Sequence, residues 1–201
     1  MRSTSVLALI AVMLVVASPA GAMTSGAEKK KPKPPGYTWR WDVATTGGGI
    51  LNPRGAASAL ADDGSKLTIS SANGKFSKPG RAVSGGGSWI AYDPTGAVMS
   101  VGTFTIKSLI GFFPVAGALP ATVTVDNLGA ASRATAGLAA FSVSYSNGYS
   151  GSLVLGSKLE ASPASALSGF TATWGPLAFL KPISLPASPT DFNRIAFHRL
   201  K

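Results

Sequence analysis

Apolar and polar residues alternate in several stretches of the chain, and this is its clearest pattern. In residues 37–43 (YTWRWDV), Tyr37, Trp39, Trp41 and Val43 are separated by polar residues. A period of two places successive side chains on opposite faces of a β-strand. The same period recurs over residues 66–70, 122–126, 168–174 and 191–198, where it places Leu67 with Ile69, Phe170 with Ala172 and Trp174, and Ile195 with Phe197.

Residues 84–107 predict a β-hairpin. Asp93-Pro94-Thr95-Gly96 has the residues of a type I turn with glycine in the left-handed bulge position. The predicted register pairs Asp93 with Ala97, Tyr92 with Val98, Ala91 with Met99, Ile90 with Ser100, Trp89 with Val101 and Gly86 with Phe104. Both faces of this hairpin would then be largely apolar, so we expect both to be covered.

Two Asn-Gly dipeptides predict further tight turns. Around Asn147-Gly148 a second hairpin spans residues 138–160, with Ser146 facing Tyr149, Val143 facing Ser152 and Phe141 facing Val154. Asn73-Gly74 predicts another two-residue turn, and the Gly- and Ala-rich residues 44–63 predict a long loop.

No stretch has the period of an amphipathic helix, and 24 Gly and 14 Pro are spread through the chain. About eight short strands separated by turns predict an all-β fold. We expect a closed or nearly closed antiparallel barrel of about eight strands, with a β-sandwich as the alternative, and core positions for Trp39, Trp41 and Trp89.

The N-terminus predicts export. Residues 1–22 combine Arg2, the apolar run of residues 6–16 and an Ala-Gly-Ala site ending at Ala22, as in a secretory signal peptide. The run is too short to span a bilayer, so no transmembrane segment is expected in the mature chain. Residues 23–36 predict a disordered Lys/Pro-rich tail, and residues 37–201 a single domain, secreted to the periplasm or the medium.

The charge balance favours acidic partners. The chain has 18 Lys and Arg against 8 Asp and Glu, a formal net charge of +10, and no cysteine. Such a balance favours acidic polysaccharide or another polyanion, with no specific nucleic acid indicated, although it also serves solubility alone. The candidate polyanion-binding residues are Lys29, Lys30, Lys31, Lys33, Lys75, Lys78 and Arg81.

Residues for catalysis are scarce. The only histidine, His198, lies near the C-terminus, where we expect an exposed side chain and no catalytic triad. Asp62-Asp63 fits a turn better than a calcium site, and the triple-glycine stretches lack the motifs of phosphate-binding loops. We therefore assign no catalytic residue, metal ligand or cofactor.

Three aromatic residues are candidates for ligand binding. Trp174 precedes Gly175-Pro176, which favours a position at the rim of the fold. Phe112 and Phe113 lie in the uncharged segment 109–120, expected to be a connection rather than a strand. If this segment is exposed, it forms an apolar contact patch. If it plugs one end of the barrel, it belongs to the core, and we favour this second interpretation.

A hairpin motif carries a partial resemblance. Ser84-Gly85-Gly86-Gly87-Ser88-Trp89 is followed on the next strand by Val101-Gly102-Thr103-Phe104. This hairpin resembles one in small exported bacterial β-rich proteins of unassigned function, which are similar to barrels of the allene oxide cyclase and dirigent type. The resemblance implies a fold and no catalytic residues.

These observations leave three functions open. We expect first a non-catalytic exported protein that binds or coats an acidic polymer. The alternatives are a carrier of a small hydrophobic ligand, or a barrel enzyme of cyclase or dirigent type, and a self-associating structural protein that forms homo-oligomers.

Overall fold

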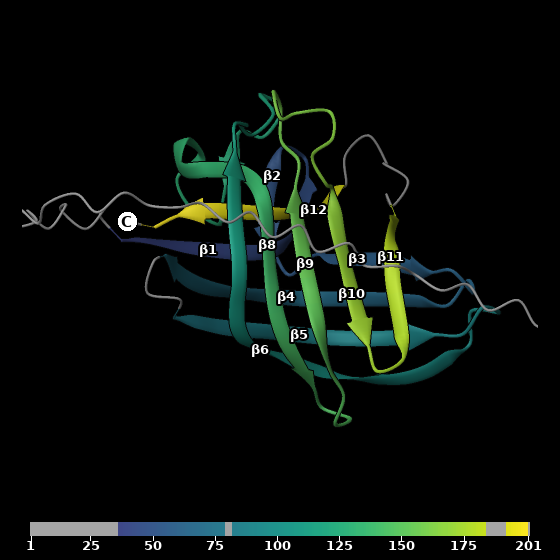
Figure 1. The fold of residues 1–201 in the computed structure, drawn as a ribbon. Helices are drawn as coiled ribbons and strands as arrows, with labels where there is room; N and C mark the ends of the chain where they lie inside the picture. The colour runs from purple at the N-terminus through teal and green to yellow at the C-terminus, as the bar shows by residue number, and fades with distance from the viewer. Residues whose placement is uncertain (1–35, 79–81, 184–191, 201) are drawn as a thin grey trace, which may run out of the picture. The chain divides into compact units, whose positions relative to one another are not determined.

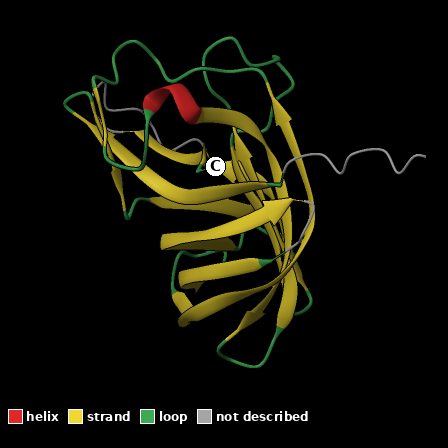
Figure 2. Cartoon of the chain, turned by 90° about the vertical axis from the view of Figure 1, so that its left-hand side faces the viewer, coloured by secondary structure: helices red, strands yellow, loops and turns green. Residues whose placement is uncertain are grey.

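The computed structural model describes residues 36–78, 82–183 and 192–200, and it confirms the all-β prediction (Figures 1 and 2). A single turn of 3-10 helix, η1 (Ala131–Arg133), is the only helix in these ranges, and none of the described helices is long and apolar enough to span a bilayer. The strands are β1 (Tyr37–Gly47), β2 (Ile50–Pro53), β3 (Ala56–Ala61), β4 (Lys66–Lys78), β5 (Val83–Tyr92), β6 (Val98–Val115), β7 (Val125–Asp126), β8 (Ala134–Tyr145), β9 (Ser150–Ser157), β10 (Gly169–Trp174), β11 (Leu177–Ile183) and β12 (Phe192–Arg199).

Strand pairing returns to its starting point through eight strands. The order is β6–β5–β4–β3–β11–β10–β9–β8, and β8 pairs again with β6. In Figure 1, β1, β4 and β5 lie in one layer, β8, β9 and β10 run across them in a second, and β6 continues from the first layer into the second. This closed, almost entirely antiparallel arrangement agrees with the predicted architecture, and a description as two facing sheets is also compatible with it.

The space between the layers is filled by side chains from the inner positions of both. One aromatic group centres on Phe112, whose ring lies 4.9 Å from Trp39, 4.8 Å from Phe76 and 5.3 Å from Phe197 between centroids. A second group joins Trp89 and Trp174 at 5.3 Å. Because the chain has no disulfide, these contacts and the strand pairing hold the fold together.

The first predicted hairpin forms with the predicted turn. The amide of Gly96 donates to the carbonyl of Asp93 at 3.0 Å, and Gly96 has a φ of +90°. The register then shifts, because Ala91 faces Ser100 while Tyr92 faces Val98, which leaves Met99 as a bulge. The predicted pairing of Trp89 with Val101 is therefore wrong. The prediction that both faces of the hairpin are covered is also wrong, since Val98, Met99 and Val101 are 60%, 50% and 62% exposed.

The second hairpin forms at the predicted place with a different turn. Tyr145 pairs with Tyr149 around a three-residue loop in which Gly148 has a φ of +90°. The ladder consequently pairs Phe141 with Leu153 rather than Val154. The glycine adopts the same bulge position as Gly96, so the predicted two-residue turn is wrong.

Asn73-Gly74 makes no turn, because both residues lie inside β4. Glycine at position 74 lets Trp41 and the backbone of Ser84 approach β4 closely. A Cβ at this position would lie 2.7 Å from Trp41 Nε1 and even closer to the carbonyl oxygen of Ser84. The predicted loop at residues 44–63 is also wrong, since it contains β2 and β3, and the predicted strand at residues 122–126 is reduced to β7. The segment 109–120 is mostly strand, because β6 continues to Val115.

Candidate functional site

A row of polar residues crosses the outer side of one layer. Alternation along β1 turns Trp39 and Trp41 inward and Arg40 outward. Strand register places His198 of β12 on one side of Arg40 and Lys75 of β4 on the other. We call the outer side of β12, β1, β4 and β5 around this row the cationic face.

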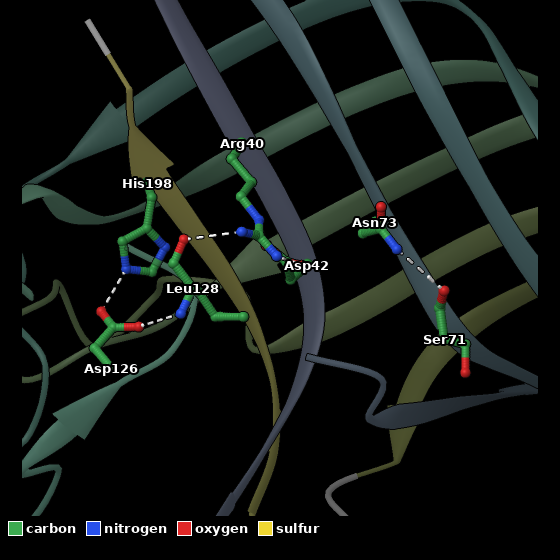
Figure 3. Close-up of polar contacts among 7 residues, drawn as sticks. All are labelled: Arg40, Asp42, Ser71, Asn73, Asp126, Leu128 and His198. Atoms are coloured by element: carbon green, nitrogen blue, oxygen red, sulfur yellow. Dashed lines mark hydrogen bonds and ion pairs between the residues drawn. The ribbon is translucent and has the colours of Figure 1, made fainter. Parts of the chain in front are cut away.

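Arg40 is neutralised within the row. Its Nε donates to Asp42 Oδ2 at 2.7 Å and its Nη2 to Asp42 Oδ1 at 2.8 Å, while Nη1 donates to the carbonyl of Leu128 at 3.0 Å (Figure 3). The Asp42 side chain is fully buried and that of Arg40 is 29% exposed. A bidentate pair of this kind satisfies a carboxylate that could not otherwise remain charged inside a protein.

His198 also has a carboxylate partner, and its predicted exposure is wrong. The ring is 1% exposed, and Nε2 lies 2.7 Å from Oδ2 of Asp126, whose side chain is 3% exposed (Figure 3). Asp126 Oδ1 accepts from the amide of Leu128 at 2.9 Å. Since both side chains are closed off from solvent, the pair fastens two parts of the chain together and offers no accessible base for catalysis.

The covering segment, residues 116–130, explains this burial. Leu128 packs with Ala44, Leu51 and Ala196 in a small apolar cluster separate from the main core. The amide of Asn127 also donates to the carbonyl of Leu51 at 3.0 Å. The covering segment thus excludes water from the part of the row that contains Asp42 and His198.

Lys75 lies on the uncovered part of the row. Its side chain is exposed and forms no ion pair with any described residue. It borders a shallow pocket of about 280 Å³ on β1, β4 and β5, and the hydroxyl-bearing residues in the lining are Thr38, Ser77 and Ser84. An ammonium group with hydroxyl groups around it is a suitable arrangement for a phosphate, sulfate or carboxylate group.

Of the other predicted polyanion-binding residues, only Lys78 lies within the described residues, and it does not line this pocket. Lys78 lies three residues after Lys75 on β4 and therefore on the opposite face of the strand. Its Nζ donates to the carbonyl of Phe112 at 3.2 Å. Lys29, Lys30, Lys31, Lys33 and Arg81 lie outside the described residues, as does the predicted signal peptide of residues 1–22. The site therefore rests on one predicted lysine together with hydroxyl groups that the sequence did not single out.

The structure separates the three aromatic candidates. Phe112 is 2% exposed in the aromatic core, and Trp174 is 7% exposed between Trp89 and Tyr149. Neither ring is available for stacking on a ligand, so the predicted rim position of Trp174 is wrong. Phe113 is 65% exposed, because consecutive strand residues point to opposite faces.

The acidic residues form no cluster suited to a metal: no group of three or more His, Cys, Asp or Glu is found within the described ranges. Asp62 pairs with Lys181 at 2.8 Å, and the hydrogen bond from Lys181 lowers the pKa of the Asp62 carboxyl. Asp63 Oδ1 accepts from the amide of Ser65 at 2.8 Å, as expected for a turn.

Comparisons with protein-family models, with curated proteins and with solved structures return no match to this chain. The resemblance to cyclase and dirigent barrels thus stays a prediction, and the function has to be argued from the site itself.

Proposed function

We propose that this chain is an exported, non-catalytic β-domain that binds an acidic polymer on its cationic face. The observation that carries the proposal is Lys75, an exposed cation without a carboxylate partner in the described ranges, beside a pocket lined by Thr38, Ser77 and Ser84. The formal charge of +10 draws a polyanion toward the molecule, and the pocket gives its acidic groups a defined place to bind.

The neutralised part of the row supports the same assignment. Asp42 is fully buried and paired with Arg40, and Asp126, whose side chain is 3% exposed, is hydrogen-bonded to His198. The neighbouring carboxylates therefore do little to repel an anion bound at Lys75.

The test is retention on immobilised polygalacturonate, an acidic polysaccharide, under a salt gradient. We expect Lys75→Glu to weaken binding about tenfold, because it replaces a charge-assisted contact by a repulsive one. Lys107→Glu is the matched control, since Lys107 is an exposed strand lysine on β6. Equal losses in the two variants would reduce the effect to net charge and contradict a site at Lys75.

The carrier alternative finds no support, because the interior is filled by aromatic and aliphatic side chains. Self-association keeps one specific observation in its favour, the exposed Val98, Met99 and Val101 beside the first hairpin turn. Light scattering at high protein concentration tests it: a strict monomer removes this alternative.

A further inference from the structure

The second layer has an outer side of a different character. Between Ala134 and Leu180 the only charged residues are Lys158 and Glu160, both outside β8, β9 and β10. The outward positions of these three strands carry Ser, Thr, Ala, Val and Gly together with Leu138. A surface so free of charge is unusual on a chain with a net charge of +10.

A row of hydroxyl groups crosses this layer. Ser108 of β6 and Ser142 of β8 have their Oγ atoms 2.7 Å apart. Ser142 faces Ser152 of β9, and Ser152 Oγ lies 3.3 Å from Thr173 Oγ1 of β10. We call the outer side of β6, β8, β9 and β10 around this row the hydroxyl face.

These hydroxyl groups retain hydrogen-bonding capacity. A hydroxyl group can donate one hydrogen bond and accept two, and each contact within the row uses only part of that capacity. Ser108 is exposed, and Ser142, Ser152 and Thr173 are partly exposed. The row therefore presents donors and acceptors at regular intervals, set by the spacing of about 4.8 Å between neighbouring strands.

Phe113 lies on the same side of the layer. It pairs with Leu138 of β8, four residues from Ser142, a separation of about 13 Å along a strand. Its ring and Leu138 line a hollow of about 250 Å³, closed on the other side by residues 163 and 165–167. An exposed aromatic ring beside a row of hydroxyl groups combines a stacking surface with hydrogen bonding.

We infer that the hydroxyl face binds a neutral polysaccharide, with one sugar ring on Phe113 and sugars further along the polymer on the hydroxyl row, about 13 Å away along β8. The apolar side of a sugar ring suits the phenyl ring, and sugar hydroxyl groups match the donors and acceptors of Ser142 and Ser152. A neutral chain fits this face better than an acidic one, because the row itself carries no charge and Lys107, at the β6 bulge, is the only described cation beside it.

The experiment maps amide chemical shifts of the full chain while cellohexaose, maltohexaose, mannohexaose and N-acetylated chitohexaose are added separately at millimolar concentration. We expect at least one of them to shift amides of β8, β9 and β10 and of Phe113, and to leave those around Lys75 unchanged. Shifts confined to other parts of the protein, or no shifts with any of the four sugars, would overturn the inference.

Variants test the two parts of the site. Phe113→Ala should weaken the sugar that binds by about five- to tenfold, and Ser142→Ala by a smaller factor. Val125→Ala is the matched control, since Val125 is an exposed apolar residue on β7. Because Phe113 is 65% exposed, its replacement should leave folding intact, and unchanged sugar affinity in that folded variant would contradict the assigned role.

Discussion

The cationic face and the hydroxyl face are both outer sides of twisted strands, yet they accommodate polar residues in opposite ways. On the cationic face, Asp42 and His198 are buried under the covering segment; Asp42 is paired with Arg40, and His198 is hydrogen-bonded to Asp126. On the hydroxyl face, the side chains of Ser142 and Ser152 stay partly exposed and neutral. Buried charged groups therefore require a partner, whereas hydroxyl groups can remain at a surface ready for a ligand.

The largest expected loss of stability comes from replacing Asp42 on the cationic face. Asp42→Ala removes both hydrogen bonds to Arg40 and leaves the guanidinium facing a buried gap. We expect the free energy of unfolding to fall by about 2–4 kcal/mol, measured by urea denaturation. Asp62→Ala is the control, because its ion pair with Lys181 is exposed, and an equal loss in both variants would contradict the role of burial.

The second effect loosens the covering segment. His198→Ala removes the contact with Asp126, and we expect unfolding to become easier by about 1–3 kcal/mol. Hydrogen exchange should also accelerate at the amides of Asn127 and Leu128, which belong to this segment and donate to Leu51 and Asp126. Faster exchange spread evenly over all strands, with no preference for the covering segment, would argue against a local fastening.

The two faces also differ in how far the sequence could predict them. The alternation of β1 predicted the buried Trp39 and Trp41, because the period of a strand is local information. Asp126 and His198 are 72 residues apart, and no local pattern links them. Their meeting depends on the covering segment, which the pattern indicated only as part of a short strand.

Register was the second limit. The bulge at Met99 and the three-residue turn at Gly148 each shift a hairpin by one position, and both depend on backbone conformation rather than on residue type alone. Lys75 was predicted as a cation, but its hydroxyl-bearing neighbours come from strand pairing. The row from Ser108 to Thr173 joins four strands and could not be read from any one of them.

The third prediction concerns stability at alkaline pH and the buried hydroxyl group of Tyr145, which lies on the inner side of the layer that carries the hydroxyl face. Tyr145 is 5% exposed and donates to the carbonyl of Thr173 at 2.9 Å, and burial raises the pKa of its hydroxyl group above its ordinary value. Above about pH 10 the unfolded chain loses this proton while the folded chain keeps it. Stability should therefore fall with rising pH, by about 1.4 kcal/mol per unit from this group.

Denaturation of the wild type and of Tyr145→Phe between pH 8 and pH 11 measures this contribution. The variant loses one hydrogen bond, worth about 1 kcal/mol near neutral pH, but it should show a shallower decline at alkaline pH. Parallel curves for the two proteins would show that Tyr145 ionises normally in the fold.

The smallest expected effect on stability comes from a variant that gives the hydroxyl face a cation like those of the cationic face. Thr171→Lys places a cation on the hydroxyl face beside Val154, along which the lysine stem can lie. We expect the free energy of unfolding to change by less than about 0.5 kcal/mol, the binding of neutral sugar to weaken, and retention on polygalacturonate to increase. Unchanged binding of both polymers would show that charge does not distinguish the two faces.

The most direct test of the account is one protein sample titrated first with a galacturonate oligomer and then with the neutral hexasaccharides, with amide shifts recorded throughout. The account predicts two separate sets of shifted residues, one around Lys75, Ser77 and Ser84 and one around Phe113, Ser142 and Ser152. A single shared set, or shifts at neither face, would contradict it.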